Sequence, residues 1–316
     1  MSKPLTQAEV DAARSDPKQA NILYHDWEAA TYDDKWSISY DERSIDYATG
    51  RFAKVAGQDP RLPGFEPYEN ALEIGSGTGF FLLNLMQAGV ARHGHLTDLS
   101  PGMVEVAVRN GERLGLSVEG QVVDGESLPY DDNSMDLVVG HAILHHIPDV
   151  ETALREVLRV LRPGGRFVFA GEPTRRGDFL ARRLSRATWW ATTTVTKLPP
   201  LRGWRRPQVE LDDSSRAAQL EAVVDLHTFA PDELRRLAIV AGASDVDVVT
   251  EEFTAAMLGW PVRTFEAAVP REKLGARWAF GAMRAWSTLA TLDDRLWRHV
   301  VPEGLFYNAL VTGLKP

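Results

Sequence analysis

The stretch "ALEIGSGTGFF" (residues 71–81) decides the fold, because it joins a short apolar run to a glycine-rich turn and a second apolar run. Gly75, Gly77 and Gly79 stand in the turn with the spacing G-x-G-x-G. Glycines at such a place permit a tight turn and leave bare backbone beside a helix N-terminus, where a polar ligand can bind. The stretch therefore predicts a strand, a ligand-binding turn and a helix, in that order.

Strand-type and helix-type segments alternate along the chain beyond this stretch. Start and stop signals such as Ser100, Pro101 and Gly115 delimit the predicted helices. Further strands are predicted at 93–98, 117–124, 135–140, 166–172, 245–253 and 304–314, and further helices at 100–115, 149–161 and 229–243. Such alternation predicts an α/β protein with a parallel sheet covered by helices on both faces.

Composition limits the classes of function. The 316 residues are 44% apolar and 25% charged, as in an ordinary globular protein, and the net charge of −9 disfavours nucleic acid as a partner. The absence of cysteine excludes disulfides, iron–sulfur clusters, thiolate zinc sites and cysteine nucleophiles. The N-terminus has no apolar signal core, and no uncharged apolar run approaches the ~18 residues of a membrane span, so a cytoplasmic location is expected.

Acidic residues stand at the ends of two further predicted strands. Asp98 can accept hydrogen bonds from both hydroxyls of a ribose, although an aspartate here can equally cap the following helix. Asp124, Gly125 and Glu126 suit the edge of an adenine ring, although an acidic surface loop has the same composition. The G-x-G-x-G spacing differs from the G-x-G-x-x-G of dinucleotide sites, which disfavours a dehydrogenase.

These motifs, with "GHLTDLSPGMVEVA" (94–107) and "EVLRVLRPGGRFVFAGEP" (156–173), resemble the class I S-adenosylmethionine-dependent methyltransferases over residues 70–173. The resemblance is to the small-molecule branch that includes the ubiquinone and menaquinone C-methyltransferases. It implies a Rossmann-like, doubly wound α/β fold whose seven-stranded sheet is mostly parallel with an antiparallel last strand. It also implies S-adenosyl-L-methionine as the cofactor and S-adenosyl-L-homocysteine as the product.

The resemblance further assigns residues to the cofactor. The glycine-rich turn would hold its methionine end, the carboxylate after the second strand its ribose, and the acidic loop after the third strand its adenine. The cofactor-binding residues that this implies are Glu73, Gly75, Ser76, Gly77, Gly79, Asp98, Leu99, Met103, Asp124, Gly125, Glu126 and His141.

The rest of the chain is divided around that core. Residues 70–172 are expected to form its cofactor-binding half, with 228–253 as its continuation and 304–316 as its last strand. Three helical additions are expected: an N-terminal lid (1–69), a basic and aromatic cap (173–227), and an aromatic insertion (254–303) that serves as a lid or a dimer contact.

The stretch "GHAILHHIPD" (140–149) holds three of the eight histidines. His141 is the leading candidate for a general base, because its place beside the transferred methyl lets it take a proton from an acceptor. Glu172, at the end of the next strand, is the second catalytic candidate. His141 and His145 are spaced like metal ligands, but they lack the H-E-x-x-H glutamate, so no metal is expected. His145 and His146 are expected to form the turn into the next helix.

Aromatic residues recur in the N-terminal segment. Tyr32, Trp36 and Tyr40 have the i, i+4, i+8 spacing that predicts one helical face. Such a face can cover the sulfonium of the cofactor, since cations are attracted to aromatic rings, or it can pack on the sheet. The three residues are therefore additional cofactor-contact candidates.

Together these observations predict a methyltransferase acting on an oxygen, nitrogen or carbon atom of a hydrophobic small molecule, such as a lipid, a quinone or a polyketide-like metabolite. Two alternatives remain, a protein methyltransferase and a non-catalytic adenosylmethionine-binding regulatory module. Residues 173–207 contain nine basic residues and one acid. With their tryptophans, residues 175–206 allow contact with a membrane surface, an anionic substrate or a second subunit, although a solvated cap has the same composition. The apolar stripe of 254–303 also allows a homodimer.

Overall fold

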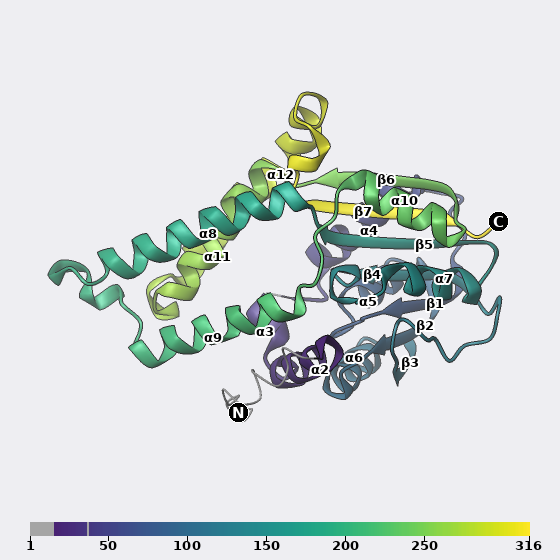
Figure 1. Ribbon diagram of the computed structural model, residues 1–316, viewed down its shortest axis with the longest axis horizontal. Coiled ribbons are helices and arrows are strands. Elements are labelled where there is room, and N and C mark those ends of the chain that lie inside the picture. The colour runs from purple at the N-terminus through teal and green to yellow at the C-terminus, as the bar shows by residue number, and fades with distance from the viewer. Residues whose placement is uncertain (1–15, 37) are drawn as a thin grey trace.

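The computed structural model describes residues 16–36 and 38–316, and its centre is a seven-stranded sheet with the order β3-β2-β1-β4-β5-β7-β6 (Figure 1). β1 through β5 pair in parallel, whereas β7 pairs antiparallel with both β5 and β6. This is the mostly parallel sheet that the sequence predicts. The strands are β1 Tyr68–Ile74, β2 Ala91–Asp98, β3 Ser117–Val122, β4 Met135–His141, β5 Leu161–Pro173, β6 Ser244–Glu251 and β7 Asn308–Leu314.

Helices cover both faces of the sheet because the central strands carry apolar side chains on both sides. On β4, Leu137 and Val139 pack with α4 (Glu42–Ala56), α5 (Phe80–Gln87) and α6 (Pro101–Arg113). Val138 points the other way, toward the side covered by α7 (Val150–Val160) and α10 (Pro231–Ala241). Successive residues of a strand point to opposite faces, so a strand buried on both sides needs an uninterrupted apolar run.

The N-terminal segment forms α2 (Pro17–Glu28) and α3 (Tyr32–Trp36) ahead of α4. The expectation that one helix carries Tyr32, Trp36 and Tyr40 is wrong, because α3 ends at Trp36 and Tyr40 lies in the extended segment before α4. Asp41 caps α4 by accepting from the amides of Arg43 and Ser44, so the chain must leave helical geometry just before that point.

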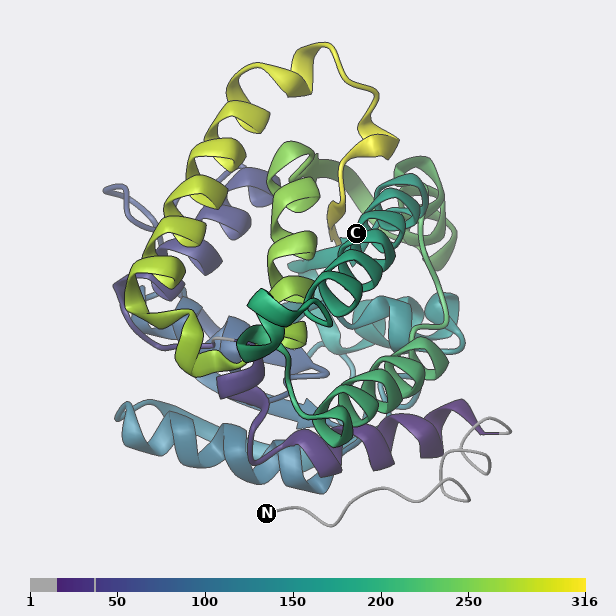
Figure 2. The ribbon, with the colours of Figure 1, turned by 90° about the vertical axis from the view of Figure 1, so that its left-hand side faces the viewer.

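The remaining helices form an arm that extends beyond the carboxyl ends of the parallel strands (Figure 1). It contains α8 (Arg175–Val195), η2 (Pro199–Trp204) and α9 (Gln208–Val224), with α11 (Thr254–Ala268) beside α8 and α12 (Gly275–Arg295) beside α11. Figure 2 shows these helices facing the viewer, with the sheet behind them. Short 3₁₀ turns are η1 Leu144–His146, η3 Arg271–Lys273, η4 Trp297–His299 and η5 Glu303–Leu305. Within the described ranges, no helix is both long and apolar enough to cross a membrane.

Candidate active site

The glycine-rich turn lies directly after β1 and needs its glycines. Gly75, Gly77 and Gly79 have φ values of +60°, +51° and +88°, in the left-handed region that side chains disfavour. A Cβ atom on Gly75 would stand 2.2 Å from Cδ1 of Ile143, so the turn also needs the missing side chain for packing. The amide of Ser76 donates to the Thr97 carbonyl at 2.8 Å, which fixes the turn against the end of β2.

Asp98 ends β2 and fastens this turn to the next helix. Its Oδ2 accepts from the Gly77 amide and its Oδ1 from the Ser100 amide, each at 2.9 Å. The side chain of Ser100 in turn caps α6 by accepting from the Met103 amide at 3.1 Å. Burial raises the pKa of Asp98 to about 6, although the two amides oppose the shift. Each carboxylate oxygen keeps a second lone pair, so Asp98 can brace the turn and still accept from a hydroxyl.

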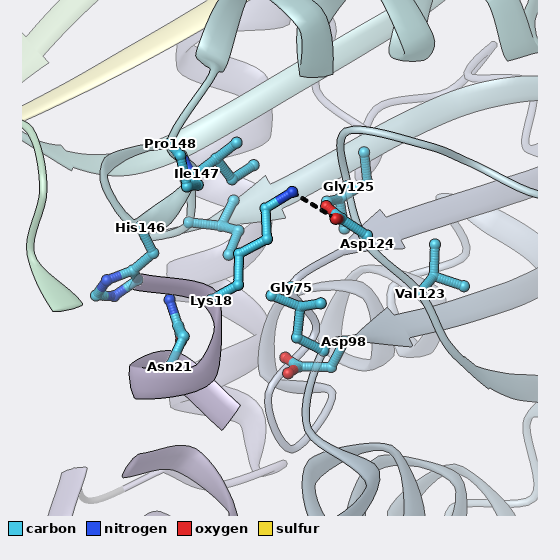
Figure 3. Close-up of a pocket in the computed structure, with 13 residues that line it drawn as sticks. Lys18, Asn21, Gly75, Asp98, Val123, Asp124, Gly125, His146, Ile147 and Pro148 are labelled. Atoms are coloured by element: carbon cyan, nitrogen blue, oxygen red, sulfur yellow. Dashed lines mark hydrogen bonds and ion pairs between the residues drawn. The ribbon is translucent and has the colours of Figure 1, made fainter. Parts of the chain in front are cut away.

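A cavity opens where four strand ends meet (Figure 3). It brings together the turn after β1, the end of β2, the loop after β3 and the segment after β4, which are distant in sequence but adjacent in a parallel sheet. The residues that line it are Lys18, Asn21, Ile74, Gly75, Asp98, Leu99, Val123, Asp124, Gly125, Ile143, His146, Ile147 and Pro148. Five of the predicted cofactor residues, Gly75, Asp98, Leu99, Asp124 and Gly125, are therefore neighbours around one cavity.

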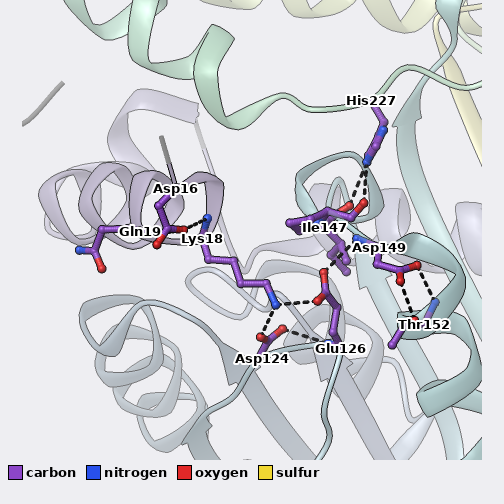
Figure 4. Close-up of polar contacts among 10 residues, drawn as sticks. Asp16, Lys18, Gln19, Asp124, Glu126, Ile147, Asp149, Thr152 and His227 are labelled. Carbon is purple, nitrogen blue, oxygen red and sulfur yellow. Dashed lines mark hydrogen bonds and ion pairs between the residues drawn. The ribbon is translucent and has the colours of Figure 1, made fainter. Parts of the chain in front are cut away.

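Lys18 is a cavity residue that the sequence reasoning missed. Its Nζ lies 2.6 Å from Oδ2 of Asp124 and 2.6 Å from Oε2 of Glu126, while Oε1 of Glu126 accepts from the Asp149 amide at 2.9 Å (Figure 4). Partial burial opposes the charge, but the two carboxylates raise the pKa of Lys18. The acidic pair predicted to meet an adenine is thus already engaged by a cation from α2.

A second contact holds the other end of α2. Oδ1 of Asp26 accepts from the Gly102 amide at 3.0 Å and also from the Ser100 hydroxyl. Because the loop after β3 holds Lys18 and the start of α6 holds Asp26, α2 is fastened near both ends and forms a strap whose Lys18 and Asn21 line the cavity. No sequence motif marks these two residues, since their partners are found only once the helix is placed.

Other predicted cofactor residues lie behind the cavity lining. Glu73 is buried, its Oε2 accepts from the Leu82 amide at 3.2 Å, and burial raises the pKa of its carboxyl well above the usual range. Met103, in the first turn of α6, is fully buried. The hydroxyls of Ser76 and Thr78 are buried and, within the part of the chain described, have no hydrogen-bond partner. Two unpaired polar atoms in the glycine-rich turn fit a polar ligand there.

The three N-terminal aromatic residues reach different places. Tyr32 lies beside the turn, because a Cβ atom on Gly77 would stand 3.9 Å from its ring. Trp36 faces α11, with the Arg263 guanidinium 5.0 Å from its ring centre. The hydroxyl of Tyr40 donates to the Thr78 carbonyl at 2.7 Å, so Tyr40 braces the turn from outside the cavity.

His141 ends β4 in an aromatic enclosure. Its Nε2 is 3.2 Å from the Tyr47 hydroxyl, and its ring lies 5.5 Å and 5.4 Å from the rings of Phe80 and Phe81. Burial, assisted by the charge of Arg51, lowers the pKa of His141 to about 4. The imidazole is therefore neutral at pH 7 and a weak base.

Glu172 is buried beside the histidine-rich stretch, and both of its carboxylate oxygens accept hydrogen bonds from that stretch. Its Oε1 accepts from the amides of Ile143 and Leu144 at 2.9 Å each, and its Oε2 accepts from the His145 amide at 3.1 Å and from His145 Nδ1 at 2.8 Å. Burial opposes ionisation of Glu172, yet these donors lower its pKa. Burial likewise opposes protonation of His145, yet the carboxylate raises the pKa of that imidazole. Glu172 and His145 therefore form an oriented pair.

A further group surrounds this pair. His146 Nδ1 donates to the Val224 carbonyl at 2.9 Å, and the centres of the two histidine rings lie 4.0 Å apart with their planes tilted by 41°. His145, His146 and Asp225 place possible metal-ligand atoms within 4.8 Å of one another. However, Arg182 Nη2 lies 2.9 Å from Oδ2 of Asp225 and already supplies a cation. We interpret the group as paired histidines beside an arginine–aspartate ion pair.

Known proteins resemble this chain in the same region. A family model described as "Methyltransferase domain" matches residues 72–169. An uncharacterised 37.1 kDa protein in transposon TN4556 of Streptomyces fradiae is 43% identical over 109 residues, which are 34% of this chain and 31% of that protein. The ubiquinone/menaquinone biosynthesis C-methyltransferase UbiE of Bartonella henselae is 31% identical over 100 residues, 31% of this chain and 38% of that protein. The chain thus matches about a third of the length of these relatives.

The fold has counterparts over nearly the whole chain. The crystal structure of the [4+2]-cyclase SpnF superposes with a TM-score of 0.55 at 19% identity, covering 95% of this chain and 97% of that one. Such low identity supports the fold alone.

The sheet order, the glycine-rich turn and the carboxylates at successive strand ends define an α/β protein with a polar cavity at the ends of its parallel strands. Residues 72–169 match the methyltransferase domain, and in the same region the chain is similar to the C-methyltransferase UbiE.

Proposed function

We propose that the protein transfers a methyl group from S-adenosyl-L-methionine to an oxygen, nitrogen or carbon atom of a hydrophobic small molecule. The observation that carries the proposal is the cavity at the strand ends, where Gly75, Asp98 and Asp124 converge within the methyltransferase domain.

The donor set of the cavity fits this cofactor. Asp98 has lone pairs for the ribose hydroxyls, and Asp124 can accept from the adenine amino group once Lys18 releases it. The unpaired hydroxyl of Ser76 and the bare backbone of the turn suit the amino acid end. The bound cofactor supplies an activated methyl group, and the protein contributes alignment and a dry site.

For an acceptor that must lose a proton, we assign the base to His145, whose Nε2 lies 3.9 Å from Oδ1 of Asp225. Because His145 Nδ1 donates to Glu172, the proton-accepting lone pair is on Nε2. Glu172 then stabilises the imidazolium that forms when Nε2 takes the proton. Glu172 is a positioning residue here, and the neutral His141 serves as a wall of the site beside the transferred methyl.

A hydrophobic acceptor is supported by the aromatic residues on the substrate side of the strand ends. Tyr47 and Phe80 surround His141, and the Trp260 ring lies 5.4 Å from that of Tyr307. The relative UbiE is by name a ubiquinone and menaquinone biosynthesis enzyme, which agrees with a lipid-soluble acceptor.

The helical additions have roles in the same proposal. The α2–α4 segment is the lid over the cofactor, and α8–α9 and α11–α12 enclose the acceptor. α12 exposes Phe280 and Met283 on one side, and this side is the surface that we assign to a homodimer.

The test is uptake of a labelled methyl group from S-adenosyl-L-methionine. We expect label in a lipid extract and none in histones or ribosomal proteins. Label in protein alone would replace the small-molecule acceptor with a protein one. Cofactor binding without label in any lipid, quinone or polyketide fraction would favour the regulatory module.

A further inference from the structure

The outer part of the arm is strongly positive in an acidic protein. Residues 179–209 contain seven basic residues and no acidic residue, whereas the whole chain has a net charge of −9. Arg182 of this segment is paired with Asp178 and Asp225, and Arg206 with Glu210. Its other basic residues are Arg183, Arg186, Lys197, Arg202 and Arg205. Such segregation favours an anionic partner for this part of the molecule.

The same segment exposes large apolar side chains. The exposed fractions are 70% for Trp190, 68% for Val209, 53% for Leu198 and 52% for Phe179. Leu184, Val195 and Trp204 are also exposed. Apolar side chains of this size are rarely gathered on a water-facing surface without a partner.

Charge and apolar surface are interleaved along one face of α8. Phe179, Arg183, Arg186 and Trp190 follow the i, i+4, i+7, i+11 spacing and are all exposed. The Arg183 guanidinium lies 4.5 Å from the centre of the Phe179 ring. Arginine and tryptophan on one face are typical of elements that lie in the interface of a membrane.

A basic hollow lies at the tip of the arm, where η2 leads into α9. Its lining residues are Lys197, Arg202, Arg205, Arg206, Pro207 and Gln208. Arg206 is paired with Glu210 at 2.8 Å, and the charges of Lys197, Arg202 and Arg205 match that of a phosphate headgroup. The exposed Leu198 and Val209, which adjoin the lining residues in sequence, suit the acyl region of a lipid layer.

The arm is joined to the strand ends that carry the active site. β5 ends at Pro173 and α8 begins at Arg175, and Figure 1 shows α8 leading away from the sheet to the tip. A partner that binds the arm therefore lies at the carboxyl ends of the parallel strands, where the candidate active site also lies.

We propose that residues 179–209, which we call the basic arm, bind the surface of a membrane that contains anionic phospholipids. The cationic hollow contacts phosphate headgroups, and Trp190, Leu198 and Val209 enter the interfacial layer. This inference goes beyond the proposed function, because membrane binding requires no methyl transfer. It would place the active site beside the phase in which a hydrophobic acceptor dissolves.

The experiment is co-sedimentation of the full chain with vesicles made of one part phosphatidylglycerol and two parts phosphatidylcholine. The test variant combines Arg183→Gln, Arg186→Gln, Lys197→Gln and Arg202→Gln. The control variant combines Arg92→Gln, Arg109→Gln, Arg155→Gln and Arg236→Gln, which removes the same charge from exposed side chains of the core. We expect the test variant to bind at least roughly tenfold more weakly and the control to bind like the unaltered protein.

A second pair of variants tests the apolar contact. Trp190→Ser should weaken vesicle binding severalfold, whereas Phe280→Ser, on a similarly exposed face of α12, should not.

Equal binding to pure phosphatidylcholine vesicles, or equal loss of binding in both charge variants, overturns the proposal. So does inorganic phosphate that blocks binding at millimolar concentration, which would identify a soluble anion site. A dimer that dissociates on Trp190→Ser would assign the surface to a second copy of the chain. The methyltransferase proposal is tested separately, by measuring uptake of a labelled methyl group in an extract that contains no vesicles.

Discussion

The strand-end cavity and the neighbouring group around Glu172 and His145 differ in how their contacts are made. In the cofactor half, backbone groups of the glycine-rich turn and a few carboxylates at strand ends make the cavity. On the acceptor side, the important contacts join side chains that are far apart in the chain, such as Glu172 with His145 and Arg182 with Asp225. The first kind of site follows from local sequence, while the second requires the packing of several elements. Substitutions in the two regions are therefore expected to alter different properties of the protein.

The largest expected effect is on the acceptor side. His145→Gln removes the proposed base, so kcat should fall by about 10²–10⁴-fold for an acceptor that must be deprotonated, with cofactor affinity unchanged. Steady-state kinetics and calorimetry measure the two quantities. His299→Gln, outside the site, is the control. An unchanged kcat would remove His145 from the chemistry.

The next effect is structural and belongs to the cofactor half. Gly75→Ala combines a left-handed backbone with a clash against Ile143, so the free energy of unfolding should fall by about 2–5 kcal/mol. Gly57→Ala is the matched control, since Gly57 has φ +67° but no atom within 4 Å of the added Cβ, and should cost about 1–2 kcal/mol. Urea denaturation compares them, and equal losses would contradict the packing argument.

Cofactor affinity should depend on the Asp98 carboxylate. Asp98→Asn should weaken binding by about 1–3 kcal/mol, because charge-assisted hydrogen bonds are lost. The pKa of Asp98 is raised to about 6, and only the ionised form accepts from both hydroxyls. Below that pKa, binding must first remove a proton, so the affinity of the unaltered protein should be about tenfold lower at pH 5 than at pH 7.

Calorimetry at the two pH values measures this dependence. Asp245→Asn, an exposed carboxylate distant from the cavity, should keep it, and Asp98→Asn should lose it. A pH dependence that survives Asp98→Asn would belong to another group.

The pH profile tests the Glu172–His145 pair. Glu172 raises the pKa of His145, and the base must be unprotonated to act, so the rising limb of kcat/KM should lie above pH 6.5. Glu172→Gln should move that limb to lower pH by removing the charge that stabilises the imidazolium. If the rising limb of the pH profile does not move, Glu172 only holds the backbone of the loop at Ile143–His145 and does not act on the pKa of His145.

The smallest effect concerns the α2 strap. Lys18 and its carboxylate partners are about one-third and less exposed, so their ion pairs contribute about 1 kcal/mol or less. Because Lys18 competes for Asp124, Lys18→Met should strengthen cofactor binding severalfold, whereas Gln19→Met should not change it. Weaker binding in Lys18→Met would make Lys18 a cofactor ligand.

The sequence predicted those parts that depend on local pattern. The strand–turn–helix around Gly75 and the carboxylate of Asp98 are placed by short motifs, and the antiparallel β7 followed from the family resemblance. Lys18 could not be found in this way, because its role depends on where α2 docks. The same holds for Tyr40, whose aromatic spacing suggested a helix that in fact ends at Trp36. Periodicity reports which face of a helix is apolar but not where the helix stops.

The central claim is that the strand-end cavity binds S-adenosyl-L-methionine through Asp98. Calorimetric titration of the unaltered chain and of Asp98→Asn with S-adenosyl-L-methionine, S-adenosyl-L-homocysteine and NAD tests it most directly. The account predicts that the first two ligands bind the unaltered protein, that both bind Asp98→Asn more weakly, and that NAD binds neither. Binding of NAD without binding of S-adenosyl-L-methionine would contradict the account.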